Sequence, residues 1–170
     1  PEEAELALLP TLWFRNHWSW GRASEEHGAK PVLRASGAHE LIAEHEELGS
    51  YRFFAEAAAN GTPELLFTDN ETNVERLWGS PNPTPFVKDA FHDYVIQGRK
   101  EAVNPARTGT KAAALYRLHL GAGKSAVVNL RLAASDVLPA KPFGRDFDEV
   151  FRARVAEADE FYAERIPAAL

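Results

Sequence analysis

Three of the chain's four tryptophans lie close together near the N-terminus, in a segment that also carries an arginine and an asparagine. They are Trp13, Trp18 and Trp20, beside Arg15 and Asn16. Indole rings stack on sugar rings, bases or cations, and arginine and asparagine orient a bound molecule through directional hydrogen bonds. The same residue types also build a buried strand that enters a bend. The segment therefore predicts either a platform for a planar polar ligand or a packing element.

A second group of polar side chains, residues 69–73, follows an apolar run at residues 64–68. Its carboxylates Asp69 and Glu71 are two positions apart, so in an extended chain they point the same way, with about 7 Å between them. A pair of carboxylates serves as acid and base in glycosidases, although adjacent groups on one strand rarely lie on opposite sides of a sugar. A catalytic pair is thus one interpretation of this group.

Two other interpretations of residues 69–73 remain open. Oxygen-bearing side chains recur at positions 69, 71, 73 and 75, as in a calcium loop, but the glycine and the closing bidentate glutamate of the helix-loop-helix pattern are missing. Alternatively, Asp69, Asn70 and Asn73 form turn-type hydrogen bonds to local backbone at the end of a strand. The residue types favour this last, structural role.

A third group, Asp89, His92 and Asp93, falls on one turn of a predicted helix, with the spacing of a metal site or an acid–base set. A solvated helix face has the same pattern. The chain lacks a glycine-rich phosphate loop, an HExxH motif, a GxSxG motif and a dinucleotide fingerprint. We therefore predict no cofactor and no metal site.

Length and composition predict a single globular domain. The chain has 170 residues, 45% of them apolar, which is enough for a sizeable core. The net charge is −6 without a basic block, so we expect no nucleic-acid or membrane partner. No apolar stretch approaches the roughly 20 residues of a spanning helix, and cysteine is absent, which fits a cytoplasmic protein. Because methionine is also absent, we expect a piece of a longer chain.

Alternating apolar residues and turn signals predict a series of short strands. The first of them, residues 4–14, also fits a short helix, and Pro10 interrupts either structure. We predict two hairpins, one joining residues 41–45 to 51–55 and one joining residues 114–120 to 126–132. The full set of predicted strands is 4–14, 32–33, 41–45, 51–55, 64–68, 114–120 and 126–132.

The remaining segments predict one rigid loop and two helices. Three prolines within residues 79–85 exclude regular structure. Apolar residues at helical spacing predict a short amphipathic helix over residues 86–96 and a longer helix over residues 146–165. The predicted fold class is mainly β: an antiparallel β-sandwich with a short internal helix and a C-terminal helix.

Six segments, taken in order, make the chain resemble the bacterial glucosidase-type proteins of glycoside hydrolase family 63. They cover nearly the whole sequence, and the two polar groups described first lie within them. Departures are small: Asp69 and His92 stand where a glutamate and an asparagine are expected. The segments are residues 9–21 (LPTLWFRNHWSWG), 43–49 (AEHEELG), 64–79 (ELLFTDNETNVERLWG), 87–98 (VKDAFHDYVIQG), 102–114 (AVNPARTGTKAAA) and 143–163 (FGRDFDEVFRARVAEADEFYA).

The resemblance implies a non-catalytic part of an α-glucosidase or α-mannosidase. In that family a β-sandwich precedes an (α/α)6 barrel, and the barrel carries the general acid and base. Residues 1–145 then correspond to a partial supersandwich, and residues 146–170 to a linker helix that leads toward the barrel. No catalytic residue is carried over to this chain.

The resemblance also implies partners and a site. The expected partners are the (α/α)6 barrel, a carbohydrate, and a second copy of the chain through unpaired strand edges. Two alternatives are an independent carbohydrate-binding sandwich and a stand-alone hydrolase that uses Asp69 and Glu71. The residues expected at the sugar rim or the interdomain surface are Trp13, Arg15, Asn16, Trp18, Trp20, Asp69, Asn70, Glu71, Asn73 and Arg76.

Overall fold

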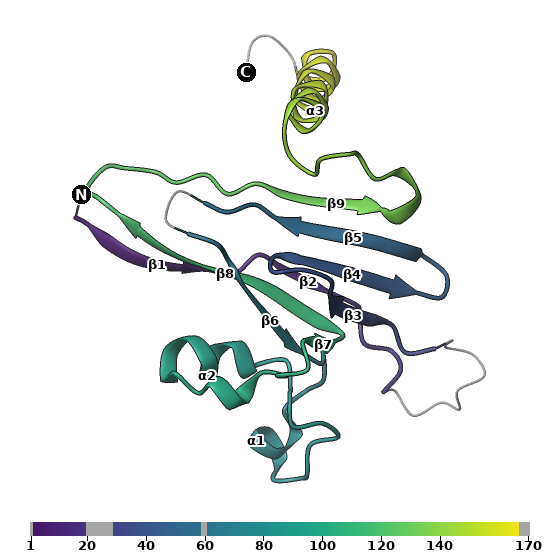
Figure 1. Cartoon of the computed structure of the whole chain (residues 1–170), viewed down its shortest axis with the longest axis vertical. Coiled ribbons are helices and arrows are strands. Elements are labelled where there is room, and N and C mark those ends of the chain that lie inside the picture. Colours follow the sequence, from purple (N-terminus) through teal and green to yellow (C-terminus); the bar gives the residue numbers. More distant parts are fainter. Residues whose placement is uncertain (1, 20–28, 59–60, 167–170) are drawn as a thin grey trace. The chain divides into compact units, whose positions relative to one another are not determined.

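The computed structural model describes residues 2–19, 29–58 and 61–166. The chain divides into two compact units, Pro1–Asp136 and Val137–Leu170. The first unit contains two antiparallel sheets, and the second contains one long helix (Figure 1).

The first sheet is built around the long strand β8 (Lys111–Leu120). Strands β1 (Ala4–Leu8) and β2 (Thr11–Trp13) pair with one edge of β8, and β6 (Glu64–Thr68) pairs with its other edge. The break between β1 and β2 falls at Pro10, which has no N–H to donate but whose carbonyl accepts from the Ala114 amide at 3.0 Å. Residues 4–13 are thus one interrupted strand, and the short-helix alternative is wrong.

The second sheet has five strands, in the order β7-β3-β4-β5-β9. The predicted hairpin of residues 41–45 and 51–55 is confirmed, because β4 and β5 pair antiparallel across a tight turn that ends at Gly49, whose φ is 81°. The bounds of the five strands are β3 Val32–Ala35, β4 Glu40–His45, β5 Gly49–Ala55, β7 Thr108–Gly109 and β9 Leu130–Ala134.

The second predicted hairpin is wrong. The turn itself forms, with the Lys124 amide donating to the Gly121 carbonyl at 2.9 Å. Beyond the turn, however, the chain crosses to the other sheet, where β9 pairs with β5 (Figure 1). The C-terminal half of β8 pairs instead with β1. Alternation and turn residues mark where strands begin and end, but they do not select the strand that occupies an edge.

The main core lies between the two sheets. Leu33, Leu41 and Phe53 of the second sheet share one buried cluster with Phe67 and Tyr116 of the first. This face-to-face packing confirms the mainly-β, sandwich-like fold class.

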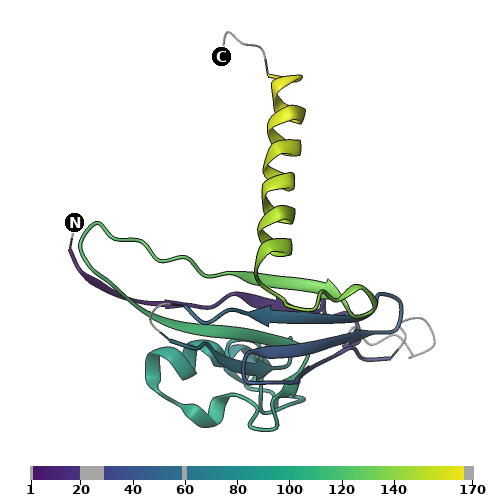
Figure 2. The ribbon, with the colours of Figure 1, turned by 45° about the horizontal axis from the view of Figure 1, so that its top comes forward.

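The first sheet is buried on its other face as well. Leu66, Ala113 and Leu115, which alternate with the residues facing the main core, pack against Phe91 and Tyr94. Both aromatic residues belong to helix α2 (Ala90–Gln97), which lies below the sheet in Figure 2. Burial on both faces explains why β6 and the first half of β8 are apolar without interruption.

Two short helices flank the proline-rich loop. Helix α1 (Val74–Trp78) has no sequence prediction, whereas α2 begins four residues later than the predicted helix over residues 86–96. The segment between them is irregular, as its prolines predict. A 3-10 turn, η1 (Lys100–Ala102), follows α2, and a second, η2 (Ser135–Val137), follows β9.

The second unit contains α3 (Arg145–Ala163), which confirms the predicted C-terminal helix (Figure 2). None of its residues is buried, although Val150, Phe151 and Val155 are apolar. The division of function between residues 1–145 and 146–170 stays a prediction. Within the part of the chain that the structure describes, no helix is long and apolar enough to cross a membrane.

Candidate functional site

The two polar groups of the sequence meet because of strand pairing around the start of β8. Lys111, the first residue of β8, is the register partner of Trp13 on one side and of Thr68 on the other. Strands β2 and β6 both run antiparallel to β8, so their C-terminal ends lie at the same end of the sheet, beside Lys111. Residues 14–19 of the tryptophan-rich segment and the polar residues 69–73 therefore follow neighbouring strand ends and lie side by side.

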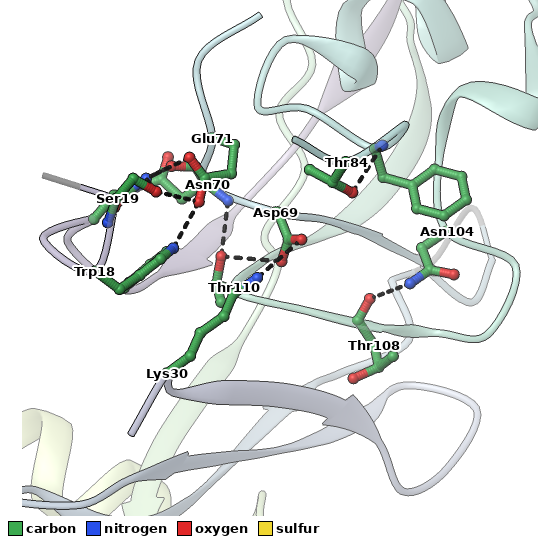
Figure 3. Close-up of polar contacts among 12 residues, drawn as sticks. Trp18, Ser19, Lys30, Asp69, Asn70, Glu71, Thr84, Asn104, Thr108 and Thr110 are labelled. Atoms are coloured by element: carbon green, nitrogen blue, oxygen red, sulfur yellow. Dashed lines mark hydrogen bonds and ion pairs between the residues drawn. The ribbon is translucent and has the colours of Figure 1, made fainter. Parts of the chain in front are cut away.

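Glu71 joins the two groups. Only 7% of this residue is exposed, and its carboxylate accepts three hydrogen bonds from the tryptophan-rich segment. The Trp18 indole N–H and the Ser19 hydroxyl both donate to Oε1 at 2.6 Å (Figure 3). The Asn16 side-chain amide donates to Oε2 at 2.8 Å. Hydrogen bonds to the charged form satisfy a buried carboxylate without a cation. Glu71 therefore holds the tryptophan-rich segment in place.

Asn70 and Asp69 complete the junction. The Asn70 side-chain amide donates to the Phe14 carbonyl at 2.9 Å, and its backbone N–H donates to the Thr110 hydroxyl oxygen at 2.8 Å. Asp69 forms an ion pair with Lys30 at 3.1 Å and accepts from the Thr110 hydroxyl at 3.3 Å (Figure 3). Their partners lie 39 to 56 residues away in the chain, so these are long-range contacts and not the turn-type bonds to local backbone that the sequence predicts for Asp69 and Asn70.

Asn73 and Arg76 face a different neighbour. Asn73 accepts from the Arg76 amide at 3.0 Å and thereby caps α1, and its own amide donates to the Asp89 carboxylate at 3.2 Å. The Arg76 guanidinium pairs with the same carboxylate at 3.2 Å. These two predicted site residues thus connect α1 to the start of α2.

An open cavity of about 610 Å³ lies where the two groups meet. Of the predicted site residues, four line it, while Trp18 and Glu71 hold one of its walls from outside the lining. Trp20 lies outside the described residues. The lining residues are Thr11, Trp13, Arg15, Asn16, Asn70, Thr72, Lys88 and Lys111.

The position of Trp13 is compatible with both interpretations of the tryptophan-rich segment, a ligand platform and a packing element. Its side chain is half exposed, at 54%, in the open cavity. It also borders a smaller cavity of about 210 Å³, which is apolar and lined from both sheets by residues that include Phe14 and Tyr51. Trp13 therefore packs at the sandwich edge and is also partly exposed in the open cavity.

Sequence reasoning missed two lysines of the cavity. The Lys88 ammonium donates to the Thr72 hydroxyl oxygen at 2.9 Å, and the Lys111 ammonium donates to the Lys88 carbonyl at 2.6 Å. Burial lowers the pKa of Lys111, the charge of Lys88 lowers it further, and the charge of Asp89 opposes both effects. No spacing in the sequence relates Lys88 to Lys111, so only the tertiary structure shows that the two lysines line the same cavity.

The carboxylates do not form an acid–base pair facing the cavity. Glu71 is buried with three donors on its oxygens, and Asp69 is bound to Lys30. At the N-cap of α2, Asp89 pairs with Arg76, and His92 within the helix is exposed. Among the described residues, no group of three His, Cys, Asp or Glu side chains has the geometry to hold a metal ion.

Comparison with known proteins finds one similar to nearly the whole chain. The chain is 30% identical over 189 aligned residues to YMR196W, an uncharacterized protein of the yeast Saccharomyces cerevisiae, and the match covers 95% of this chain. The chain spans only 17% of the length of that yeast protein. No family model matches the chain, and no solved structure gives a significant match.

Proposed function

We propose that the chain is a non-catalytic β-sandwich segment of a larger glycoside hydrolase similar to family 63, of the α-glucosidase or α-mannosidase type. In this role it supports the (α/α)6 barrel and forms part of the rim of its sugar pocket. The observation that carries the proposal is the open cavity at the ends of β2 and β6, where the exposed ring of Trp13 lies among amide and hydroxyl side chains.

The composition of the cavity suits a sugar. A pyranose has an apolar ring face that stacks on indole and a rim of hydroxyl groups that need hydrogen-bond partners. Trp13 offers the ring surface, and the side-chain amide of Asn70 with the hydroxyls of Thr11 and Thr72 offers donors and acceptors. Sites of this size and mixed lining bind small molecules.

The need for a larger protein rests on two observations. Most of the yeast relative lies outside its match to this chain, which leaves ample length for a catalytic domain. Helix α3 also exposes Phe151, Phe161 and Tyr162, large apolar and aromatic side chains that an adjoining domain would cover. Both agree with a sandwich and linker helix that precede a barrel.

A second candidate is an independent carbohydrate-binding module. The observation that favours it is that every residue lining the cavity lies within the first compact unit, between Thr11 and Lys111. Such a site needs no barrel for its formation. Under this proposal the isolated chain binds α-glucosides or α-mannosides by itself.

The test compares Trp13→Ala with Trp78→Ala, because Trp78 is an exposed tryptophan of α1 outside the cavity. In the intact gene product, hydrolysis of aryl α-glucosides and α-mannosides is measured. Trp13→Ala is expected to raise KM about tenfold, the effect of losing one stacking contact of about 1.5 kcal/mol, whereas Trp78→Ala leaves KM unchanged.

A gene product without such activity, or one whose KM and kcat are unchanged by Trp13→Ala, would contradict the rim proposal. Calorimetric titration of the 170-residue chain with methyl α-glucoside and methyl α-mannoside distinguishes the second candidate function from the first. Saturable binding that Trp13→Ala weakens favours the independent module.

A further inference from the structure

We infer that the open cavity is an anion site, and that its ligand is a sugar carrying a carboxylate or phosphate group. Three cationic side chains, Arg15, Lys88 and Lys111, line this one cavity. No aspartate or glutamate of the described residues is among its lining. In a chain with a net charge of −6, this local excess of positive charge runs against the overall composition.

The two lysines differ from other basic residues of the same region. Lys30 pairs with Asp69, Arg76 with Asp89, and Arg99 with Asp93. Basic residues beside these strand ends and helices are thus commonly matched with a carboxylate.

Within the described residues, Lys88 and Lys111 have no such ion pair. Lys88 contacts the Thr72 hydroxyl, and Lys111 contacts the Lys88 carbonyl. An ammonium group has three donors, so each lysine retains donors for a bound oxyanion.

Electrostatics make an anion the favoured occupant. The ammonium of Lys111 is partly removed from water, and the like charge of Lys88 acts on it. The opposing charge from α2 is Asp89, whose carboxylate already interacts with Arg76 and Asn73. An oxyanion between the lysines would replace lost hydration and offset their repulsion.

The lysines are held in place by backbone structure. Lys111 begins β8 between its partners on β2 and β6, and its ammonium lies 4.9 Å from the centre of the Phe91 ring on α2. Its bond to the Lys88 carbonyl ties it to the residue that precedes the cap of α2. The charge of Lys111, held on a regular element, is therefore preorganised for a ligand.

The sugar half of the inference rests on the proposed function, whereas the anion half does not. Trp13 supplies a ring surface beside the cations, and Asn70 supplies an amide. A ligand that satisfies all of these groups has a hydroxylated ring and one oxyanion. Uronates and sugar phosphates share this chemistry.

Calorimetric titration of the 170-residue chain tests the inference with four probes: glucuronate, glucose 6-phosphate, methyl α-glucoside and inorganic phosphate. One or both charged sugars are expected to bind at least about tenfold more tightly than the neutral glucoside, as one hydrogen bond to a charged group provides. Their affinity is expected to fall as sodium chloride rises. Preference between the two charged sugars assigns the carboxylate or the phosphate.

Variants connect the binding to the lysines. Lys88→Gln is expected to reduce the affinity of the charged sugar to that of the neutral glucoside, and Lys88→Arg to retain it. Lys124→Gln, in the turn after β8, is the matched control and should bind as the parent does. Because Lys88 is exposed, its replacement leaves folding intact, which thermal unfolding verifies.

Four outcomes would overturn the inference. Equal affinity for glucuronate, glucose 6-phosphate and the neutral glucoside would refute the anion site while leaving the sugar proposal in place. Inorganic phosphate binding as tightly as glucose 6-phosphate would refute the sugar half. Equal weakening by Lys88→Gln and Lys124→Gln, or no binding of any charged probe, would show that these lysines form no specific site.

Discussion

Glu71 illustrates how a single buried charge organises the candidate site. Its three donors come from a segment more than fifty residues away, and they include one ring and one amide that sequence reasoning assigned to a ligand. The Trp18 indole N–H and the Asn16 side-chain amide therefore donate hydrogen bonds to Glu71. Of the predicted site residues, Trp13, Arg15, Asn16 and Asn70 line the cavity.

Glu71→Gln is expected to destabilise the chain by about 1–3 kcal/mol, because the new amide would point a donor at the Asn16 amide in a buried position. Unfolding in urea measures the change. Glu47→Gln, at an exposed position in the turn between β4 and β5, serves as the control and should lie within about 0.5 kcal/mol of the parent. Equal midpoints for the parent and Glu71→Gln would mean that the carboxylate does not hold the segment.

At the scale of the elements, the two sheets approach each other closely at Gly109. The chain passes there from β7 of the second sheet toward β8 of the first, and the Thr110 amide donates to the Thr68 carbonyl at 3.1 Å. A β-carbon on Gly109 would lie 2.3 Å from that carbonyl oxygen. Only glycine permits this approach, since the obstacle is backbone.

Gly109→Ala is expected to cost at least about 1–3 kcal/mol of folding stability, as overpacking does, because relief requires moving the end of β6. The same movement displaces Asp69 to Glu71, so the binding proposed for the cavity is expected to weaken too. Gly121→Ala is the matched control, since its β-carbon would lie 3.6 Å from a flexible lysine side chain. Chemical denaturation that gives the two variants equal stability would contradict the close approach.

The elements also separate what local sequence predicts from what it does not. The β4–β5 hairpin was predictable because its alternation, its short loop and Gly49 are all local. The partner of β8 was not, because β1 lies more than a hundred residues away in the chain. Helix α1 was missed because five residues with no buried side chain leave no apolar periodicity to detect.

At the scale of the whole molecule, Tyr116 connects the two sheets. It is buried in the main core, and its hydroxyl, from β8 of the first sheet, donates to the Glu56 carbonyl just after β5 of the second at 2.7 Å. Burial, followed by the charge of Glu56, raises the pKa of Tyr116 to about 12 from 10.0. Folded Tyr116 therefore keeps its proton at a pH where the unfolded chain loses it.

The contribution of Tyr116 to stability is fully present below pH 10 and is lost as the pH rises from about 10 to 12. Tyr116→Phe is expected to lower stability at neutral pH by about 0.5–1.5 kcal/mol and to show a smaller decline across that interval. Urea unfolding at several pH values provides the measurement, with Tyr162→Phe, an exposed tyrosine of α3, as control. Parallel pH profiles for the parent and Tyr116→Phe would contradict the raised pKa.

The sequence by itself determined the mainly-β class, most strand positions, the local hairpin and the C-terminal helix, because alternation and turn chemistry act over a few residues. It also pointed to the two polar groups. The tertiary structure alone decided that both groups meet at Lys111, that Glu71 holds one to the other, and that Lys88 and Lys111 share a cavity with Trp13. The physical reason is that strand pairing joins residues distant in the chain through backbone hydrogen bonds, which every residue type offers, so no side-chain pattern announces the partner.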